Sequence, residues 1–598
     1  MIDPPPSIII VGAGLGGLAL AALLEHINVS YVILERLTEV KSNGAALFIP
    51  PVAANLLRQL GIYDEVRQKA KPCHSIDLYT EKRKPLFVLD FADFSTMSGA
   101  EGFIIPRKAL YDIILELIPT EKILRGKRVL SFVQGEGGVQ VKCADGSVHE
   151  SDILVGADGT YSAVRQNLYE RLKKEGKLSV SDQKPPSFNC VCLTAQTYPL
   201  DPETFPELSE PGCHYNNVVA QNKPYSWMTF TGKDNIVCWS VIQYLNKENS
   251  ELNDTFRSSD WGSGLAEAMC RDVQNFPIPG GNGKLTLADL IVNTPRDQIA
   301  KVTLEEKVFE SWYGGRTVLL GNAVHKFHPA GGEGALCSLY DAVSLANWIN
   351  VLETNTIAGL DVIFKEYADE RLPFARAALI HSRNMANMYS RTFKASMARF
   401  VSRNMPDFLW KTKLAKSAAD RAQAAFLPLI QDSGTVPPLF QPSLHKTLAI
   451  LEAQAAAKKA QEDASGTTSI TSTTSTTTGS SGFSGISRST TATTVPVPVP
   501  AYPPQTHANA DRYQQYQGPN LSSSATSSIH NLPPAPFAPT LSSSSTSSLS
   551  AHVHTSPPPH RHHQHQYSYS SLTGAQPPSS SSAASIHGAS KASTAVPL

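Results

Sequence analysis

The chain lacks several features that would place a protein in a class at once. Its 598 residues carry a formal net charge of zero with a pI of about 7.3, so bulk charge gives no indication of a nucleic-acid partner. No unbroken apolar run reaches the roughly 18 residues that a transmembrane helix requires. The apolar stretch near the N-terminus has no basic leader and is interrupted by glycines, which argues against a secretory signal peptide.

Metal-binding and nucleophilic motifs are also missing. The eight cysteines lie scattered between Cys73 and Cys337, and no Cys-x-x-Cys pair or His/Cys ligand spacing occurs. We therefore predict no metal site, and reduced thiols in a cytoplasmic setting. No Gly-x-Ser-x-Gly nucleophile elbow occurs either, and we name no catalytic side chain.

The stretch from Ile8 to Glu35 has the pattern of a dinucleotide-binding unit. An apolar run predicts a strand buried in a parallel sheet, a glycine-rich turn follows, and an alanine- and leucine-rich run predicts a helix. Gly12 permits the tight turn, Gly14 lets the backbone approach a pyrophosphate, and Gly17 lets the helix pack close to the strand. Glu35 follows the second predicted strand and is placed to accept hydrogen bonds from ribose hydroxyls. The pattern predicts a dinucleotide site and leaves FAD and NAD open.

Two more stretches repeat the order of strand, glycine loop and helix. The first has an apolar run and a glycine turn within Ser151–Thr160, followed by a predicted helix over Ser162–Leu172. The second has a predicted buried strand over Thr317–Gly321, a glycine-rich loop, and a predicted helix over Leu336–Asn350. Three such crossings predict an α/β chain built around a parallel sheet.

The region 185–300 has a different texture, with more aromatic residues and alternating polarity. Tyr225–Phe230 and Ile236–Tyr244 flank a short polar turn and predict a β-hairpin. One face of this sheet-rich region is expected to line a pocket. Two interpretations, pocket wall or sheet core, stay open for Tyr225, Trp227 and Trp239.

The C-terminal part is predicted to be helical and then disordered. A long amphipathic helix is predicted over Phe364–Met397, with a kink at Pro373. Ala398–Ile430 mixes lysine and arginine with aromatic residues, which is typical of a membrane-surface helix or of a solvated helical face packed on the core; we favour the second. After Asp463 the composition is dominated by Ser, Thr and Pro, which predicts disorder, and the sequence names no partner for this tail.

The three glycine loops together carry a family resemblance. They read Gly12 to Gly17, then Gly156-Ala-Asp-Gly159 with Arg165, then Leu320-Gly-Asn-Ala-Val-His325 with Pro329 and Gly332-Glu-Gly334. In type and order they resemble the motifs of the class A, para-hydroxybenzoate-hydroxylase-type FAD-dependent monooxygenases, over roughly residues 7–380. Within that family the chain is most similar to fungal FAD-dependent monooxygenases, including epoxidases of terpenoid pathways.

The resemblance implies a fold and a division of the chain. The implied architecture is a Rossmann-like FAD-binding domain interleaved with a β-sheet substrate domain, then a helical extension and a disordered tail. The expected segments are 1–182 and 301–380 for the FAD-binding domain, 183–300 for the substrate domain, 381–462 for the helical extension and 463–598 for the tail.

The resemblance also implies which residues hold the cofactor. All of them lie in or beside the three loops: Gly12, Gly14, Gly17, Glu35, Ala46, Arg107, Asp158, Asn322, Gly334 and Ala335. The first loop is expected to cradle the FAD pyrophosphate, Glu35 to bind the adenosine ribose, and Arg107 to reach the phosphate or ribityl region. Asp158 is associated with both FAD and NADPH, and Asn322 with the ribityl hydroxyls. Ala46 is expected to lie against the cofactor, and the last two residues to face the isoalloxazine through their backbone.

The implied activity is that of a flavoprotein oxidoreductase. NADPH or NADH binds transiently and reduces the flavin, and O2 adds to give a C4a-hydroperoxide. One oxygen atom is then transferred, by hydroxylation or epoxidation, to a small apolar molecule of aromatic or isoprenoid type. The protein is expected in the cytoplasm, with weak contact to an internal membrane left open.

Two positions depart from the family pattern. Asn322 stands where the family has Asp, and it loses charge-assisted hydrogen bonding worth about 1 kcal/mol. Glu333 stands where the family has Gln, and its charge would oppose an anionic reduced flavin. The nearby His325 and His328 are expected to be structural rather than acid–base catalysts. These departures motivate a second hypothesis, a catalytically impaired FAD-fold protein that acts as a binding or scaffold protein through its tail.

Overall fold

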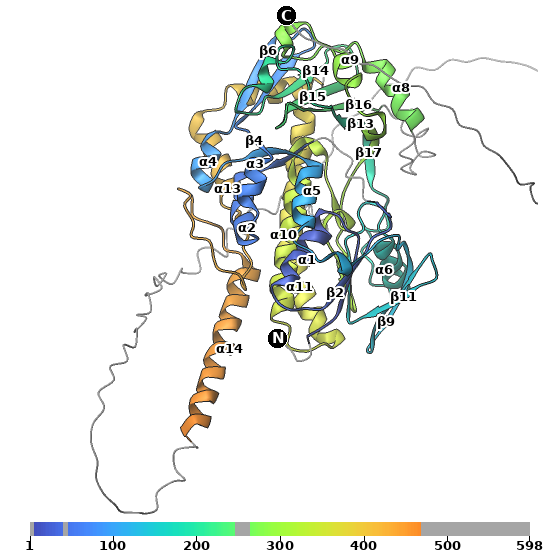
Figure 1. Ribbon diagram of the computed structural model, residues 1–598, viewed down its shortest axis with the longest axis vertical. Helices are drawn as coiled ribbons and strands as arrows, with labels where there is room; N and C mark the ends of the chain where they lie inside the picture. The colour runs from blue at the N-terminus through green and yellow to red at the C-terminus, as the bar shows by residue number, and fades with distance from the viewer. Residues whose placement is uncertain (1–4, 40–45, 246–262, 391, 468–598) are drawn as a thin grey trace, which may run out of the picture. The chain divides into compact units, whose positions relative to one another are not determined.

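Two large β-sheets organise the residues that the structure, a computed structural model, describes: 5–39, 46–245, 263–390 and 392–467. One sheet has six strands and the other has eight, and helices cover both (Figure 1). The predicted α/β class is therefore confirmed. The boundaries predicted for the chain's segments stay predictions, because the larger sheet takes strands from more than one of them.

The six-stranded sheet collects the three predicted strand–loop–helix crossings. Its order is β18 (Tyr313–Gly314), β19 (Thr317–Leu319), β12 (Ile153–Gly156), β1 (Ile8–Val11), β2 (Tyr31–Leu34) and β8 (Ile123–Leu124). Strand β1 runs parallel to β12 and β2, and β12 runs parallel to β19. The carboxyl ends of β1, β12 and β19 thus meet at one edge, where open α/β sheets bind ligands.

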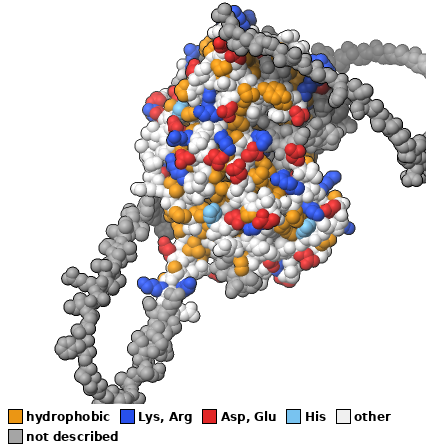
Figure 2. Space-filling model, in the orientation of Figure 1, with side chains coloured by type: hydrophobic (Ala, Val, Ile, Leu, Met, Phe, Trp, Pro, Cys, Tyr) orange, Lys and Arg blue, Asp and Glu red, His pale blue; other side chains and the backbone are white. Residues whose placement is uncertain are grey.

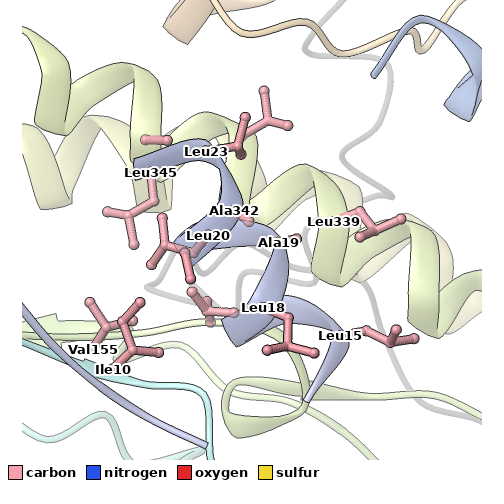
Figure 3. Packing of buried hydrophobic residues seen from close by; sticks show 14 of the residues in the cluster. Ile10, Leu15, Leu18, Ala19, Leu20, Leu23, Val155, Leu339, Ala342 and Leu345 are labelled. Atoms are coloured by element: carbon pink, nitrogen blue, oxygen red, sulfur yellow. The ribbon is translucent and has the colours of Figure 1, made fainter. Parts of the chain in front are cut away.

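Two apolar helices cover one face of this sheet. Helices α1 (Leu15–Glu25) and α10 (Glu333–Asn350) lie side by side, and apolar side chains of both, among them Leu20, Leu23 and Leu339, belong to one buried cluster (Figure 3). Nearly every residue of α1 is buried, which explains why its sequence is apolar on all sides. This packing holds the first and third glycine loops together although they are about 310 residues apart in the chain.

The eight-stranded sheet forms the second layer of the architecture. Its order is β20 (His325–Lys326), β17 (Ala300–Val308), β13 (Ser187–Gln196), β16 (Val237–Tyr244), β15 (Tyr225–Thr231), β14 (Tyr215–Val219), β5 (Ser75–Thr80) and β6 (Pro85–Asp90). The predicted hairpin forms as the antiparallel pair β15–β16. Strands β5 and β6 come from the first third of the chain, and β5 joins the sheet through a parallel pairing with β14.

The two faces of this sheet separate core from pocket. Helices α8 (Ser263–Val273) and α9 (Leu287–Ile291) lie over one face, where Trp227 and Trp239 are fully buried. The indole of Trp227 donates to the Pro277 carbonyl at 2.8 Å, and its ring lies 4.8 Å from that of Phe276. The two tryptophans are therefore sheet core, which settles the interpretation left open for them, and Tyr225 packs on the same Phe276 ring at 5.2 Å.

Smaller elements complete the described part. The remaining helices of the first 180 residues are α2 (Ala54–Gln59), α3 (Tyr63–Gln68), α4 (Asp93–Ser98), α5 (Arg107–Leu115) and α6 (Ala163–Lys174). Two three-stranded sheets consist of β3 (Ala46–Ile49), β7 (Phe103–Pro106) and β4 (Lys71–Pro72), and of β9 (Val129–Gly135), β10 (Gly138–Cys143) and β11 (Val148–Ser151). Strand β7 leads directly into α5, which places Arg107 at a helix start.

The C-terminal helices differ from the predicted ones at their ends. Helix α11 (Ile357–Met388) begins earlier than predicted, because the Thr356 side chain accepts from the Gly359 amide, and it continues through Pro373. It also ends earlier, and the Thr392 hydroxyl starts a new helix, α12 (Phe393–Arg403). Helices α13 (Asp407–Ala418) and α14 (Pro442–Thr467) follow, with an extended segment between them.

Two predictions concern the outside of the molecule. The predicted tail begins at residue 463, yet α14 runs to Thr467, and the remainder of the tail lies outside the described residues. Among the described helices none combines the length and apolarity needed to cross a bilayer. On the face that Figure 2 shows, acidic and basic side chains are interspersed, in keeping with the balanced net charge.

Candidate functional site

One cavity of about 1780 Å³ connects the glycine loops with the larger sheet. Nine of the ten predicted cofactor residues line it, and Gly17 is the exception. Ligand pockets commonly measure about 300–1,000 Å³, so this cavity has room for a dinucleotide and a second molecule. The fold therefore brings the predicted site together from four separate stretches of sequence.

Each glycine of the first loop is required for a different structural reason. Gly12 has a left-handed φ of 104°, and a Cβ there would lie 2.6 Å from the Ala157 carbonyl oxygen of the second loop. A Cβ at Gly17 would lie 2.2 Å from the Gly12 carbonyl oxygen, so this position packs helix against loop. A Cβ at Gly14 would meet nothing within 4 Å, which leaves the backbone open toward the cavity.

Glu35 is buried beside the first loop and braces it. Its Oε2 accepts from the Ala13 amide at 2.8 Å, and its Oε1 accepts from the Leu37 amide at 2.9 Å. Each carboxylate oxygen keeps a further lone pair, and the side chain lines the cavity. The carboxylate thus holds the loop and retains acceptor capacity for hydroxyl donors.

The second loop is tied to the third. Asp158 Oδ2 accepts from the amides of Ala163 and Val164 at 2.7 and 3.2 Å, at the start of α6, and burial raises the pKa of this carboxyl. Arg165 donates to the Thr160 carbonyl at 2.7 Å and to the Ala323 carbonyl at 2.6 Å. Arg165 thus braces the turn of the second loop and joins it to the third.

Two polar side chains face the cavity without a protein partner. In the described residues the Arg107 guanidinium has neither a hydrogen bond nor an ion pair, and burial lowers its pKa. The exposed Asn322 amide likewise makes no side-chain hydrogen bond to a described residue. A half-buried cation without a counter-charge is unfavourable unless a ligand supplies one. Together with the open backbone at Gly14 and Gly334, these groups fit FAD, which carries an anionic pyrophosphate and ribityl hydroxyls.

A pair of titratable groups lies beside the third loop, one on α10 and one on α11. Glu333 Oε1 lies 3.7 Å from His381 Nε2 of α11, and both line the cavity. Burial, with a smaller effect of the negative Asp420, raises the pKa of Glu333 to about 7. Burial lowers the pKa of His381. Both groups are thus shifted toward their neutral forms, which reduces the repulsion expected between Glu333 and a reduced flavin.

Comparison with known proteins gives the same picture. The model of the FAD binding domain family matches residues 6–186 and 284–382. The FAD-dependent monooxygenase esdpE of Penicillium shearii is 27% identical over 443 residues, which cover 71% of this chain and 86% of that protein. The FAD-dependent monooxygenases ausM of Emericella nidulans and paxM of Penicillium paxilli are 28% and 27% identical, each over 71% of this chain and 88% of the relative. The chain belongs to the FAD-dependent monooxygenases.

Solved structures of low sequence identity share the fold. Klebsiella pneumoniae HpxO with FAD and uric acid is 18% identical with a TM-score of 0.54, and it covers 68% of this chain and 95% of its own. CtdE with FAD and its substrate is 16% identical with a TM-score of 0.53, over 69% and 97%. The family model and the fungal relatives, together with this shared fold, confirm the predicted family, enzyme class and FAD cofactor of this monooxygenase, and the scaffold hypothesis is not favoured.

The monooxygenase has a buried polar network that sequence reasoning missed. Asp341 of α10 accepts from His325 Nε2 at 2.6 Å, from Arg371 Nε at 3.0 Å and from the Gly321 amide at 3.1 Å. This network fixes the third loop from beneath, so His325 is structural, as expected. Asp341 is the one charged residue between positions 334 and 350, and that isolated charge in an apolar helix was the available signal.

His328 is also held in a structural role. Its Nδ1 accepts from the Ala330 amide at 3.2 Å, at the start of a short 3-10 helix. The residue is 2% exposed, and burial lowers its pKa to about 4. A neutral imidazole with one nitrogen engaged by the backbone agrees with the structural role predicted for it.

The far end of the cavity is apolar. The wall combines side chains from β13 to β17 with others from α11 and α13: Cys192, Met228, Phe230, Ile242, Leu304, Met385, Met388 and Trp410. Met228 and Phe230 alternate with Trp227 on β15, so the pocket lies on the sheet face opposite the tryptophans. Sequence reasoning identified the correct hairpin but considered only the residues that face the core.

Proposed function

We propose that this monooxygenase uses NADPH or NADH to insert one atom of O2 into a small or mid-sized apolar molecule of aromatic or isoprenoid type, by hydroxylation or epoxidation. The second oxygen atom leaves as water, with electrons from the nicotinamide. The observation that carries the proposal is the single cavity in which the three glycine loops and the apolar wall meet. The names of the fungal relatives agree with this reaction class.

The residues of the chain divide the work of holding the cofactor. Bound FAD supplies electron transfer and oxygen activation. The loop amides around Gly14 and the guanidinium of Arg107 would balance the pyrophosphate charge, and Glu35 would accept from the ribose. Asn322 would hold the ribityl chain through its amide, and the open backbone at Gly334 would leave space for the flavin ring.

The apolar wall would position the substrate and exclude water. Met228, Phe230 and Ile242 offer contact area and no charge, which suits a substrate with little polarity. Exclusion of water protects reactive oxygen species from unproductive decay. Glu333 and His381 are the titratable groups at this end of the cavity, and in their neutral forms they would not repel the reduced cofactor.

The proposal also includes where and with what the enzyme works. We place it in the cytoplasm, with the nicotinamide cofactor binding transiently over the FAD domain, and with contact to a membrane surface as argued below. No protein partner of the C-terminal tail is proposed.

The test is spectroscopic. Purified full-length protein is expected to show flavin absorbance, to be bleached by NADPH or NADH without air, and to recover its colour in air. The rate at which the enzyme consumes O2 should then be higher with a candidate apolar substrate present than without it. A colourless protein that takes up no added FAD would sink the proposal.

A further inference from the structure

Helix α12 turns its large apolar side chains away from the protein. Phe393, Met397, Phe400 and Val401 recur at spacings of three and four residues and therefore share one face of the helix. All four are exposed, from 47% for Met397 to 80% for Phe393. In a soluble helix such a stripe normally faces the core, so the orientation of α12 is inverted.

The inverted orientation is held by specific contacts. Ala395 is buried, and Ala398, Arg399 and Ser402 on the same side are partly buried. The Arg399 guanidinium donates to the carbonyls of Met388 and Ser390, which ties α12 to the end of α11. Small residues and this arginine thus face the protein, and the outward direction of the phenylalanines follows from the packing.

The first turn of α13, separated from the end of α12 by three residues, also carries exposed apolar side chains. Phe408 and Leu409 are 67% and 45% exposed, whereas Leu414 and Ala418 further along the helix are buried against a cluster that includes Phe94. We call Phe393, Met397, Phe400, Val401, Phe408 and Leu409 the α12–α13 face. The core-packing interpretation favoured from the sequence holds for the second half of α13, whereas the large apolar side chains of this face lie exposed.

Most of the charged side chains in α12 and α13 are basic, although Lys411 is paired with Asp93 and Asp407, each at 3.2 Å. Residues 393–418 contain six basic side chains, at positions 394, 399, 403, 411, 413 and 416, and one acid, Asp407. Lys394 and Arg403 lie within α12 and are exposed. With 11 residues, α12 is too short to cross a bilayer. Exposed aromatic residues with surrounding lysine and arginine are the composition of helices that lie in the interface of an anionic membrane.

The face also adjoins the cavity. Ser402 of α12, Met405 between the helices, and Trp410 and Lys413 of α13 line the cavity described above. The two helices therefore form part of the cavity wall on one side and the exposed apolar face on the other.

We propose that the α12–α13 face binds the surface of a bilayer that contains anionic lipid, and that apolar substrate enters the cavity from that bilayer. Charge complementarity selects this occupant over a second copy of the chain, because two copies would bring two basic faces together. Membrane binding is independent of the oxygenase function proposed above, whereas substrate delivery rests on it.

The test is flotation of the full-length protein with vesicles. Vesicles of phosphatidylcholine with about 30 mol% phosphatidylserine are compared with pure phosphatidylcholine at low salt. We expect the protein to float with the anionic vesicles, and expect about 500 mM salt to release most of it, because that concentration screens surface charge. The variant F393S/F400S/F408S should lower the partition coefficient at least tenfold, and K394E/R403E should lower it for the anionic vesicles.

Matched controls separate binding from folding. The variant V133S/V292S/V362S changes three other apolar residues that are 61–78% exposed, and it should float like the wild type. The melting temperature and flavin absorbance of every variant should match the wild type, so loss of flotation with normal flavin content is specific to the face. Failure of flavin reduction with normal flotation would overturn the function proposed above and leave membrane binding in place.

Three outcomes would overturn the proposal. The first is that no wild-type protein floats with the anionic vesicles. F393S/F400S/F408S could float as well as the wild type, which would assign binding to another part of the chain. A wild-type dimer that this variant converts to a monomer, in light scattering without vesicles, would assign the face to a second copy.

Discussion

Among the site residues, Arg107 has the environment that most clearly indicates a bound anionic ligand. It lies at the start of α5, lines the cavity, and has no partner among the described residues. The sequence motif placed an arginine near the cofactor but did not reveal that the guanidinium lacks a counter-charge. The absence of a counter-charge depends on the distances from Arg107 to all acidic residues in the folded protein, and no local sequence pattern determines those distances.

Arg107→Ala should weaken FAD binding without weakening the fold. Loss of a charge-assisted hydrogen bond costs about 1.5–3 kcal/mol, which corresponds to roughly a 10- to 100-fold higher Kd. The apoprotein should unfold at the same denaturant concentration or a slightly higher one, because an unpaired, half-buried cation has been removed. Titration of apoprotein with FAD and urea unfolding measure the two effects. The exposed Arg296→Ala is the matched control, and equal losses of FAD affinity in both variants would contradict the assignment.

Glu333 gives a prediction about pH. Its pKa is raised to about 7 in the folded protein, so between about pH 4.5 and pH 7 the unfolded chain loses this proton while the folded chain keeps it. The contribution of Glu333 to stability therefore falls as pH rises through that window and is constant above it. Glu333→Gln removes the effect, so the variant should gain about 1–2 kcal/mol relative to wild type between pH 5 and pH 7.5. Urea unfolding of both apoproteins at the two pH values measures the gain. Parallel pH profiles would contradict the pKa shift.

At the scale of elements, helices and strands could be predicted from local patterns, but the pairing of distant strands could not. The strand, glycine turn and helix that begin at β1 were predictable, because periodicity and glycine spacing are local properties. The parallel pairing of β5 with β14 joins residues about 140 positions apart, and the sequence contains no local signal for it. For the same reason the hairpin was predicted, but which of its faces lines the pocket stayed open until the structure placed the tryptophans in the core.

Two glycines of the first loop should respond in opposite ways. Gly17→Ala places a methyl group 2.2 Å from a backbone oxygen where α1 meets β1, and should destabilise the protein by about 3 kcal/mol or more. Gly14→Ala meets nothing within 4 Å, and Gly14 has an extended conformation that alanine adopts. Its stability should change by less than about 0.5 kcal/mol, while FAD affinity falls at least tenfold because the methyl group faces the cavity. Thermal unfolding of the apoproteins and FAD titration separate the two effects, and equal destabilisation would contradict this account of the loop.

At the scale of the described molecule, the cavity is the place where otherwise separate layers meet. Loops of the six-stranded sheet, one face of the eight-stranded sheet, α11 and α13 all contribute to its wall. The sequence predicted the glycine loops, the sheet-rich region and the long helix separately. The family resemblance predicted that a flavin binds where they meet. Their common cavity explains why the predicted site residues are spread over more than 300 positions.

FAD should therefore stabilise both sheets together. At a free concentration of about 100 times its Kd, a ligand that binds only the folded state adds about 2.7 kcal/mol, equivalent to a rise in melting temperature of about 3 °C for a protein of this size. Tryptophan emission, to which the buried Trp227 and Trp239 contribute, and flavin release should then change at the same temperature in one scan. Riboflavin lacks the pyrophosphate and should give a smaller rise at the same concentration, and Arg107→Ala should reduce the rise with FAD. If FAD delayed flavin release but left the tryptophan transition unchanged, the two sheets would unfold independently and the cavity would not couple them.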